Sequence, residues 1–274
     1  MGVRNMATIW QQAEELKDEM VERRRDLHRH PETGWTEFRT ASMIIGELKN
    51  LGYDVKFGDD VIDEKSMMGV PSEAELADYM QRAISEGADP ELVKKMAGGK
   101  TGIVATLKTD KPGKTVAFRF DMDCNDVEEE RSEEHRPAKE GFASEHKKAM
   151  HACGHDGHLA VGLGVAQWIK DHADQLCGKI KLVFQPAEEG TRGARPMAEG
   201  GILDDVDFIV CTHIGSSVPL HQVAVCTHGY LATTKLDIYF EGVPAHAGAN
   251  PEKGRSALMA ACSAAMMLVG IPRS

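Results

Sequence analysis

The sequence TVAFRF at residues 115–120 is followed, after a helical stretch at 156–175, by KIKLVF at residues 179–184. Both short runs are apolar and rich in strand-forming residues, and the stretch between them repeats apolar residues at helical spacing. Similar runs at 102–107 and 207–212 predict two more strands. Because strands that alternate with helices are typical of α/β proteins, we expect a central, mostly parallel sheet flanked by helices.

The residues before this pattern predict two further helical regions. Apolar positions at helical spacing predict a helix over residues 8–50. The polar, acidic segment at about 58–100 is expected to be an insert, in which two short helices at 73–96 are separated by the turn residues of GADP at 87–90.

The character of the sequence changes at about residue 229. Alternating polar and apolar residues predict a half-exposed strand at 233–241, and an Ala- and Met-rich stretch predicts a helix at 255–269. A lone strand and helix bury little apolar surface by themselves. We therefore expect a catalytic domain over 1–228 and only the first part of a smaller α+β domain over 229–274.

Bulk composition limits the classes of partner. The 274 residues carry a formal net charge of −11, which argues against a nucleic-acid-binding surface. No apolar run approaches the roughly 18 residues that a membrane span needs, and the N-terminus lacks the pattern of a signal peptide. Six cysteines in a chain of this length do not indicate a disulfide framework. We expect a cytoplasmic protein that binds neither membranes nor nucleic acid.

Residues that can bind a metal ion form four groups, three directly after predicted strands and one at the start of the long helix. In open α/β sheets, ligands collect outside the carboxyl ends of the strands, so these four groups are expected on one rim of the sheet. The groups are Asp121 with Asp123; His151, Cys153, His155, Asp156 and His158; Glu188 with Glu189; and His213.

The motif HACGHD at residues 151–156 is the most specific of these groups. Cys153 and His155, two residues apart, cannot share one helical face, so both must project from a tight turn, which Gly154 allows. A thiolate together with an imidazole suits zinc, manganese or a similar divalent ion. The alternative interpretation is a reactive or buried cysteine beside surface histidines.

The pair Glu188 and Glu189 suits hydrolytic chemistry. Neighbouring residues in a loop point in different directions, so one carboxylate can bind a metal while the other exchanges a proton with an activated water. A solvated acidic turn is the alternative. Asp123 can orient a ligand or simply form a turn, and His213 can be a ligand or a buried histidine at a strand end.

Five motifs resemble the M20 metallopeptidase family. They are RRDLHRHPE at 24–32, DMD at 121–123, MHACGHDGH at 150–158, QPAEEG at 185–190 and PAHAG at 244–248. The likeness is greatest to the amidohydrolase branch, which includes aminoacylases, auxin-conjugate hydrolases and p-aminobenzoyl-glutamate hydrolases. Segments 68–71, 98–107 and 189–195 favour the last of these groups.

The resemblance implies a fold like that of zinc exopeptidases and a role for each matching residue. Glu188 matches the general base and acid, and Asp123 matches a supporting aspartate. His246 matches a histidine of a lid and dimerisation domain that stabilises the oxyanion in the active site of a neighbouring subunit, so a homodimer or a heteromer with a homologous subunit is expected. Two divalent ions, Mn²⁺ or Zn²⁺, are expected on four side chains: Cys153, His155, Glu189 and His213.

The expected activity is hydrolysis of the amide bond of a small N-acyl amino acid, with p-aminobenzoyl-glutamate as the favoured substrate. A dipeptidase or carboxypeptidase that uses the same site is one alternative. Family members extend well beyond 274 residues, and their returning segment supplies a further histidine ligand. A truncated, non-catalytic chain that binds metal or acts as an interaction subunit is therefore the other alternative.

Overall fold

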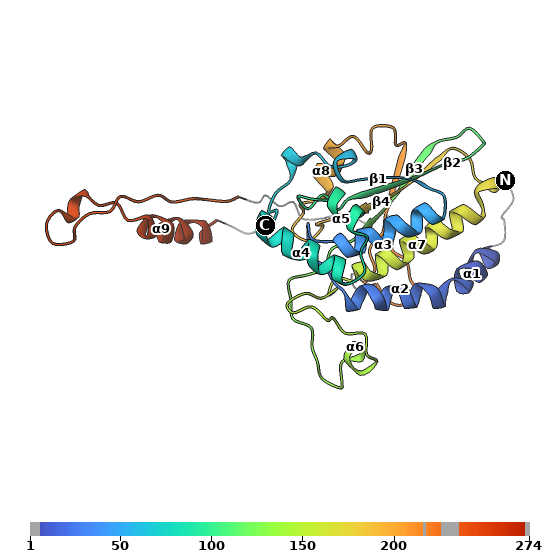
Figure 1. Ribbon diagram of the computed structural model, residues 1–274, viewed down its shortest axis with the longest axis horizontal. Helices are drawn as coiled ribbons and strands as arrows, with labels where there is room; N and C mark the ends of the chain where they lie inside the picture. The colour runs from blue at the N-terminus through green and yellow to red at the C-terminus, as the bar shows by residue number, and fades with distance from the viewer. Residues whose placement is uncertain (1–5, 216–217, 226–235, 272–274) are drawn as a thin grey trace. The chain divides into compact units, whose positions relative to one another are not determined.

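The computed structural model describes residues 6–215, 218–225 and 236–271 (Figure 1). They belong to two compact units, Met1–Val225 and Cys226–Ser274. The first unit is built on a five-stranded sheet with the strand order β1-β2-β4-β3-β5. Its strands are β1 Asp54–Phe57, β2 Ile103–Lys108, β3 Thr115–Asp121, β4 Lys179–Gln185 and β5 Phe208–Cys211.

Strand direction follows from the lengths of the connections. β3 pairs in parallel with β4 and β5, and the helix between β3 and β4 supplies the crossover that a parallel pair needs. β2 is antiparallel to β4, because the short connection 109–114 to β3 reverses the chain without a crossover, and it also pairs antiparallel with β1. The expected α/β sheet is confirmed, with β2 running against the other strands. The sequence pattern did not predict the short edge strand β1.

The helix expected over residues 8–50 is wrong in its extent. This region forms three helices, α1 Met6–Glu15, α2 Lys17–Arg29 and α3 Phe38–Asn50. Pro31 disfavours a helical conformation at the residue before it, and α2 ends just ahead of that point. Trp35, with a φ of 69°, then turns the chain into α3.

The remaining helices of the first unit connect the strands or belong to the insert. The two short helices expected at 73–96 are present, and α4 begins with a capping box formed by Ser72 and Glu75. No helix in the part of the chain that the structure describes has the length and apolarity of a membrane span. These helices are α4 Glu73–Ser85, α5 Pro90–Lys95, α6 Arg136–Lys139, α7 His155–Asp171, α8 Ala194–Glu199, and the 3-10 helices η1 Gly58–Asp60, η2 Glu64–Ser66 and η3 Ala173–Gln175.

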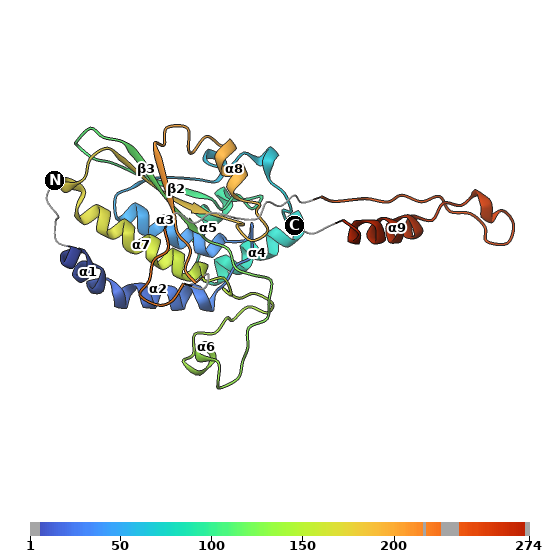
Figure 2. The ribbon, with the colours of Figure 1, turned by 180° about the vertical axis from the view of Figure 1, so that it is seen from behind.

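Alternate residues of the strands bury their side chains on opposite faces of the sheet. On one face Phe120 and Phe184 pack with ring centroids 5.4 Å apart, and Gly162 of α7 approaches the Phe120 ring so closely that a Cβ there would lie 2.9 Å from it. On the other face Val183 belongs to a second buried cluster with Met197 of α8. Figures 1 and 2 show α2, α3 and α7 together on one side of the sheet and α8 on the other.

The second unit contains the expected helix, α9 Ala257–Val269, and the 3-10 helix η4 Pro251–Lys253. The strand expected at 233–241 is not formed over 236–241, and residues 233–235 lie outside the described residues. A strand needs a neighbour to pair its backbone groups. In the described part of this unit the only bridge joins Val243 to Arg255.

Candidate metal centre

Side chains that could bind a metal ion converge at the rim where β3, β4 and β5 end. The ligand atoms of Cys153, His155 and His213 all lie within 4.8 Å of one another, and those of His155, Glu188 and Glu189 form a second group within the same limit. Because His155 belongs to both groups, the two sets of donors adjoin. The structure therefore brings together the four expected ligands and the expected general base.

The two imidazole rings are held with the same nitrogen turned toward the shared space. Nδ1 of His155 lies 2.8 Å from the backbone oxygen of Asp123, and Nδ1 of His213 lies 2.7 Å from that of Ile214. A carbonyl oxygen only accepts, so each Nδ1 carries a hydrogen, and each Nε2 is the nitrogen that can offer a lone pair to a metal ion once it is deprotonated. Nε2 of His213 lies 3.4 Å from Sγ of Cys153.

Among the four expected metal ligands, two buried polar atoms have no hydrogen-bond partner among the described residues. They are Nε2 of His155 and Oε1 of Glu189. Leaving a buried polar atom unpaired costs about 1–3 kcal/mol. Both atoms are Lewis bases at the edge of one donor group, so a divalent cation would satisfy both. The residues present therefore fit a metal site.

Asp123 supports the loop that carries the two glutamates. Its Oδ1 accepts the backbone N–H of Glu188 and its Oδ2 accepts that of Glu189, both at 2.9 Å. The loop also contains Ala187 and Thr191 in the left-handed region, with φ of 46° and 59°. Such residues cost on the order of 1–3 kcal/mol each, so the loop depends on contacts that hold it in this conformation.

The turn that carries Cys153 is fixed from two sides. The backbone N–H of Cys153 donates to Oδ1 of Asn125 at 3.1 Å, which ties the turn to the segment after β3. Gly154 has a φ of 85°, and a Cβ at this position would lie 2.9 Å from the side chain of Ile214. Glycine thus allows both the turn and its close approach to the segment that carries His213.

Without a metal, the centre retains protons. Burial and nearby carboxylates raise the pKa of Glu188. Burial, together with Glu189, raises the pKa of the Cys153 thiol to about 11. Burial lowers the pKa of His155, but its contact with Asp123 and other negative charge outweigh this and raise it to about 9. A cation that binds here would displace protons from its ligands.

Comparison with known proteins identifies the family. The sequence model of peptidase family M20/M25/M40 matches residues 117–272. The chain belongs to this family. Among curated relatives, it is 52% identical to indole-3-acetyl-aspartic acid hydrolase of Enterobacter agglomerans, over 94% of the chain and 59% of the relative. It is 48% identical to one of the subunits of p-aminobenzoyl-glutamate hydrolase from Escherichia coli K12, over 97% of the chain and 61% of the relative.

Solved structures agree with this assignment. The aminobenzoyl-glutamate utilization protein from Klebsiella pneumoniae superimposes with a TM-score of 0.78 at 44% identity, over 96% of this chain and 60% of that one. A dinuclear metal-binding M20 peptidase from Bacillus subtilis gives a TM-score of 0.54 at 28% identity, over 75% and 45%. The chain thus spans about three fifths of the length of the curated M20 relatives described above.

Sequence reasoning assigned no role to one histidine of this M20 site. The backbone N–H of Ile214 donates to Nε2 of His158 at 3.1 Å, so Nδ1 carries the hydrogen and donates to Oδ2 of Asp121 at 3.1 Å. With both nitrogens engaged, His158 holds the residue that follows His213. Its position three residues after His155 on one helix was the signal that could have placed it near the centre.

His246 of this M20 chain lies in the second unit, which is described by itself. Its Nδ1 accepts the backbone N–H groups of Gly248 and Ala249, each at 3.1 Å. The ring therefore carries its hydrogen on Nε2, and the side chain is exposed. In this tautomer, Nε2 of His246 can donate a hydrogen bond.

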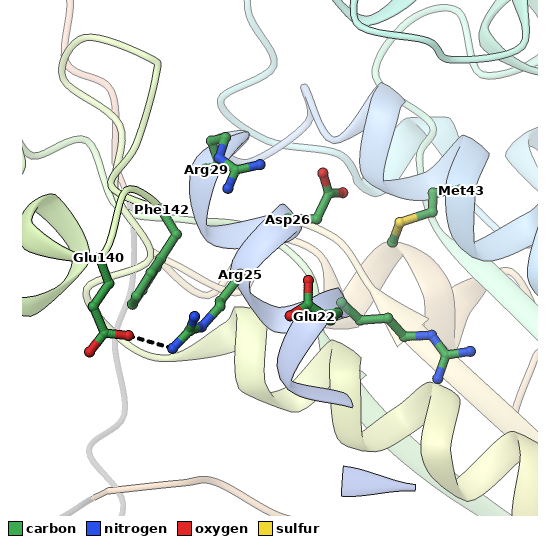
Figure 3. A pocket seen from close by; sticks show the side chains of 8 residues that line it. Glu22, Arg25, Asp26, Arg29, Met43, Glu140 and Phe142 are labelled. Carbon is green, nitrogen blue, oxygen red and sulfur yellow. Dashed lines mark hydrogen bonds and ion pairs between the residues drawn. The ribbon is translucent and has the colours of Figure 1, made fainter. Parts of the chain in front are cut away.

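A separate cavity of about 440 Å³ lies between α2 and the loop that contains α6 (Figure 3). Its charged side chains other than Glu22 pair with one another or with neighbours. Arg25 donates to Glu140, as the dashed line shows, and Asp26 pairs with Arg39 of α3. None of the candidate metal ligands lines this cavity, so it contributes nothing to the M20 centre.

Proposed function

We propose that this chain carries the metal-binding catalytic domain of an M20 amidohydrolase that hydrolyses the amide bond of N-acyl amino acids. One observation carries the proposal. A thiol, two imidazoles and two adjacent glutamates, from segments far apart in sequence, converge at one rim. Two buried atoms of this group that could bind a metal ion, Nε2 of His155 and Oε1 of Glu189, have no hydrogen-bond partner among the described residues.

The residues then have distinct tasks. Two divalent ions, Mn²⁺ or Zn²⁺, would lower the pKa of a water and polarise the substrate carbonyl. Glu188, with Oε2 3.8 Å from Nε2 of His155, takes a proton from the attacking water and returns it to the leaving nitrogen. Asp123 keeps Glu188 and Glu189 in place through their backbone amides. The four proposed metal ligands are Cys153, His155, Glu189 and His213.

The proposal extends to the second domain and to assembly. Residues 1–228 would form the catalytic domain and 229–274 the first part of a lid and dimerisation domain. His246, with its hydrogen on Nε2, would donate to the oxyanion at the active site of a neighbouring subunit. The Escherichia coli relative is named as one of the subunits of its hydrolase, which supports a heteromer with a homologous partner chain beside the alternative of a homodimer.

Two relatives favour one substrate class. Their names give indole-3-acetyl-aspartic acid and p-aminobenzoyl-glutamate as substrates. Both compounds join an aromatic acyl group to an acidic amino acid through an amide bond. We therefore propose an N-aroyl or N-arylacetyl derivative of glutamate or aspartate as the substrate, with p-aminobenzoyl-glutamate favoured.

Metal content and turnover together test the proposal. The chain would be loaded with Mn²⁺ or Zn²⁺, desalted and analysed for metal, and release of p-aminobenzoate from p-aminobenzoyl-glutamate would be followed with and without chelator. About two metals per chain and chelator-sensitive turnover are expected. One tightly held zinc without turnover would instead support a structural, non-catalytic chain. Faster cleavage of dipeptides in a substrate panel would favour a dipeptidase.

A further inference from the structure

We propose that Glu37 is a positioning residue that holds the loop carrying Glu188 and Glu189 in its metal-binding conformation. This inference rests on the proposed function, because it assigns a task at the same metal site. Glu37 immediately precedes α3, and 150 residues separate it from Ala187 of the loop. The side chain is fully buried.

The Glu37 carboxylate makes two hydrogen bonds. Its Oε1 accepts the backbone N–H of Ala187 at 2.8 Å, and its Oε2 accepts the hydroxyl of Thr101 at 2.6 Å. The second contact fixes the direction of the carboxylate, so the first can fix the loop. A buried acid with this geometry is an anchor between α3 and the loop after β4.

Glu37 and Asp123 together hold three consecutive backbone amides. Glu37 accepts the amide of Ala187, and the two oxygens of Asp123 accept those of Glu188 and Glu189. The directions of the two glutamate side chains follow from the orientation of these peptides. Asp123 accepts only the second and third of these amides, and Glu37 accepts the first.

Ala187 is the residue at which such an anchor matters. Ala187 is fully buried, and its backbone lies in the left-handed region. A non-glycine residue in this region is strained, so its surroundings must hold it in this conformation. Packing limits where it can go. A Cβ on Gly34 would lie 3.1 Å from Cα of Ala187, and the oxygen of Ala187 accepts the N–H groups of Arg192 and Gly193. Without Glu37, the buried N–H of Ala187 would lose its acceptor.

The chain provides a matched control in Glu32. This glutamate is also buried, and its two oxygens accept the backbone amides of Arg39 and Thr40 at 3.0 and 2.8 Å. It therefore resembles Glu37 in burial and in bonding to the backbone, but it acts on α3 itself. Loss of Glu32 should lower stability without changing the metal site.

The test measures metal affinity of the full 274-residue chain by calorimetric titration of metal-free protein with Zn²⁺. Glu37→Ala is expected to weaken binding by about tenfold or more, the range found for groups that orient ligands. Glu37→Gln should restore most of the affinity, because its amide oxygen can still accept the N–H of Ala187. Glu32→Ala should bind Zn²⁺ like the parent.

A double-mutant cycle with Glu189→Ala identifies the route of the effect. If Glu37 acts through Glu189, Glu37→Ala adds little to the loss caused by Glu189→Ala. Additive losses, or equal losses from Glu37→Ala and Glu32→Ala, would overturn the positioning role. If Glu189→Ala itself leaves Zn²⁺ affinity unchanged, the proposed metal site is wrong instead.

Glu37→Asp covers the case in which Glu37→Ala does not fold. It retains a buried carboxylate that is one methylene shorter, which draws the acceptor away from Ala187. Weakened Zn²⁺ binding in a folded Glu37→Asp protein supports the proposal, and parental binding overturns it.

Discussion

Sγ of Cys153 lies 3.4 Å from Nε2 of His213, although 60 residues separate the two in sequence. The turn before α7 carries the thiol, and the segment after β5 carries the imidazole. β3 pairs in parallel with β5, and the turn before α7 is tied to the segment after β3. The fold thus brings a soft and a borderline donor to one point, which suits a divalent transition metal.

Replacing Cys153 tests this pair directly. Cys153→Ser exchanges a soft thiolate for a hydroxyl that rarely ionises, so Zn²⁺ affinity should fall by about tenfold or more. With Co²⁺ in place of Zn²⁺, the parent should show a thiolate-to-cobalt charge-transfer band that the variant lacks. Cys177→Ser, at an exposed cysteine, is the control. A charge-transfer band that persists in Cys153→Ser would contradict the assignment.

Glu188→Gln separates proton transfer from metal binding. The amide keeps the size of the side chain but cannot take a proton, so turnover should fall by about 10²–10⁴-fold. Metal content, measured on the same samples, should equal that of the parent because Glu188 is not proposed as a ligand. Glu133→Gln, at an exposed residue of the α6 loop, controls for loss of a negative charge. Parental turnover in Glu188→Gln would exclude it as the base.

The strands and the ligand motif were predictable because their signals are local. Alternation of β-branched runs with a helical stretch predicted β2 to β5, and the spacing of Cys153 and His155 predicted a turn rather than a helical face. The single helix expected over 8–50 failed for a local reason too. Pro31 was visible in the sequence, whereas the left-handed turn at Trp35 depends on the fold.

The supporting contacts could not be predicted from residue patterns. Glu37 and His158 act on the backbone amides of Ala187 and Ile214, and an amide has no signature in a sequence. Only the fold shows which amide meets which side chain. Sequence reasoning thus found side chains that belong to a recognisable motif, Asp123 included, and it assigned no role to Glu37 and His158, which hold main-chain amides.

His158 offers a test of such a contact. His158→Ala removes the acceptor of the Ile214 amide, so the segment carrying His213 should loosen and Zn²⁺ affinity should fall by about tenfold. His146→Ala is the control, because His146 is also buried but contacts the oxygen of Pro31 and the carboxylate of Glu86. Both variants should unfold more easily than the parent. Equal losses of Zn²⁺ affinity would show that the effect of His158→Ala is only a loss of stability.

Acid stability should depend on the ion pair that joins α2 to α3. Hydrogen bonding to His30 and the charge of Arg39 lower the pKa of Asp26 from 3.8 to about 2, and both guanidinium Nη atoms of Arg39 donate to this carboxylate at 3.0 Å. At a pH between these two pKa values, the unfolded chain binds more protons than the folded protein. The stability that Asp26 contributes is therefore present above about pH 4 and is lost as the pH falls toward about 2.

Asp26→Asn should therefore lower the free energy of unfolding of the metal-free protein most above about pH 4, and the deficit should shrink as the pH falls toward about 2. Urea unfolding followed by circular dichroism across this range measures the difference between parent and variant. Asp110→Asn, at an exposed aspartate between β2 and β3, should give a small difference that does not change with pH. A deficit in Asp26→Asn that stays constant from about pH 5 to about pH 2 would mean that packing, and not the charge of Asp26, stabilises this junction.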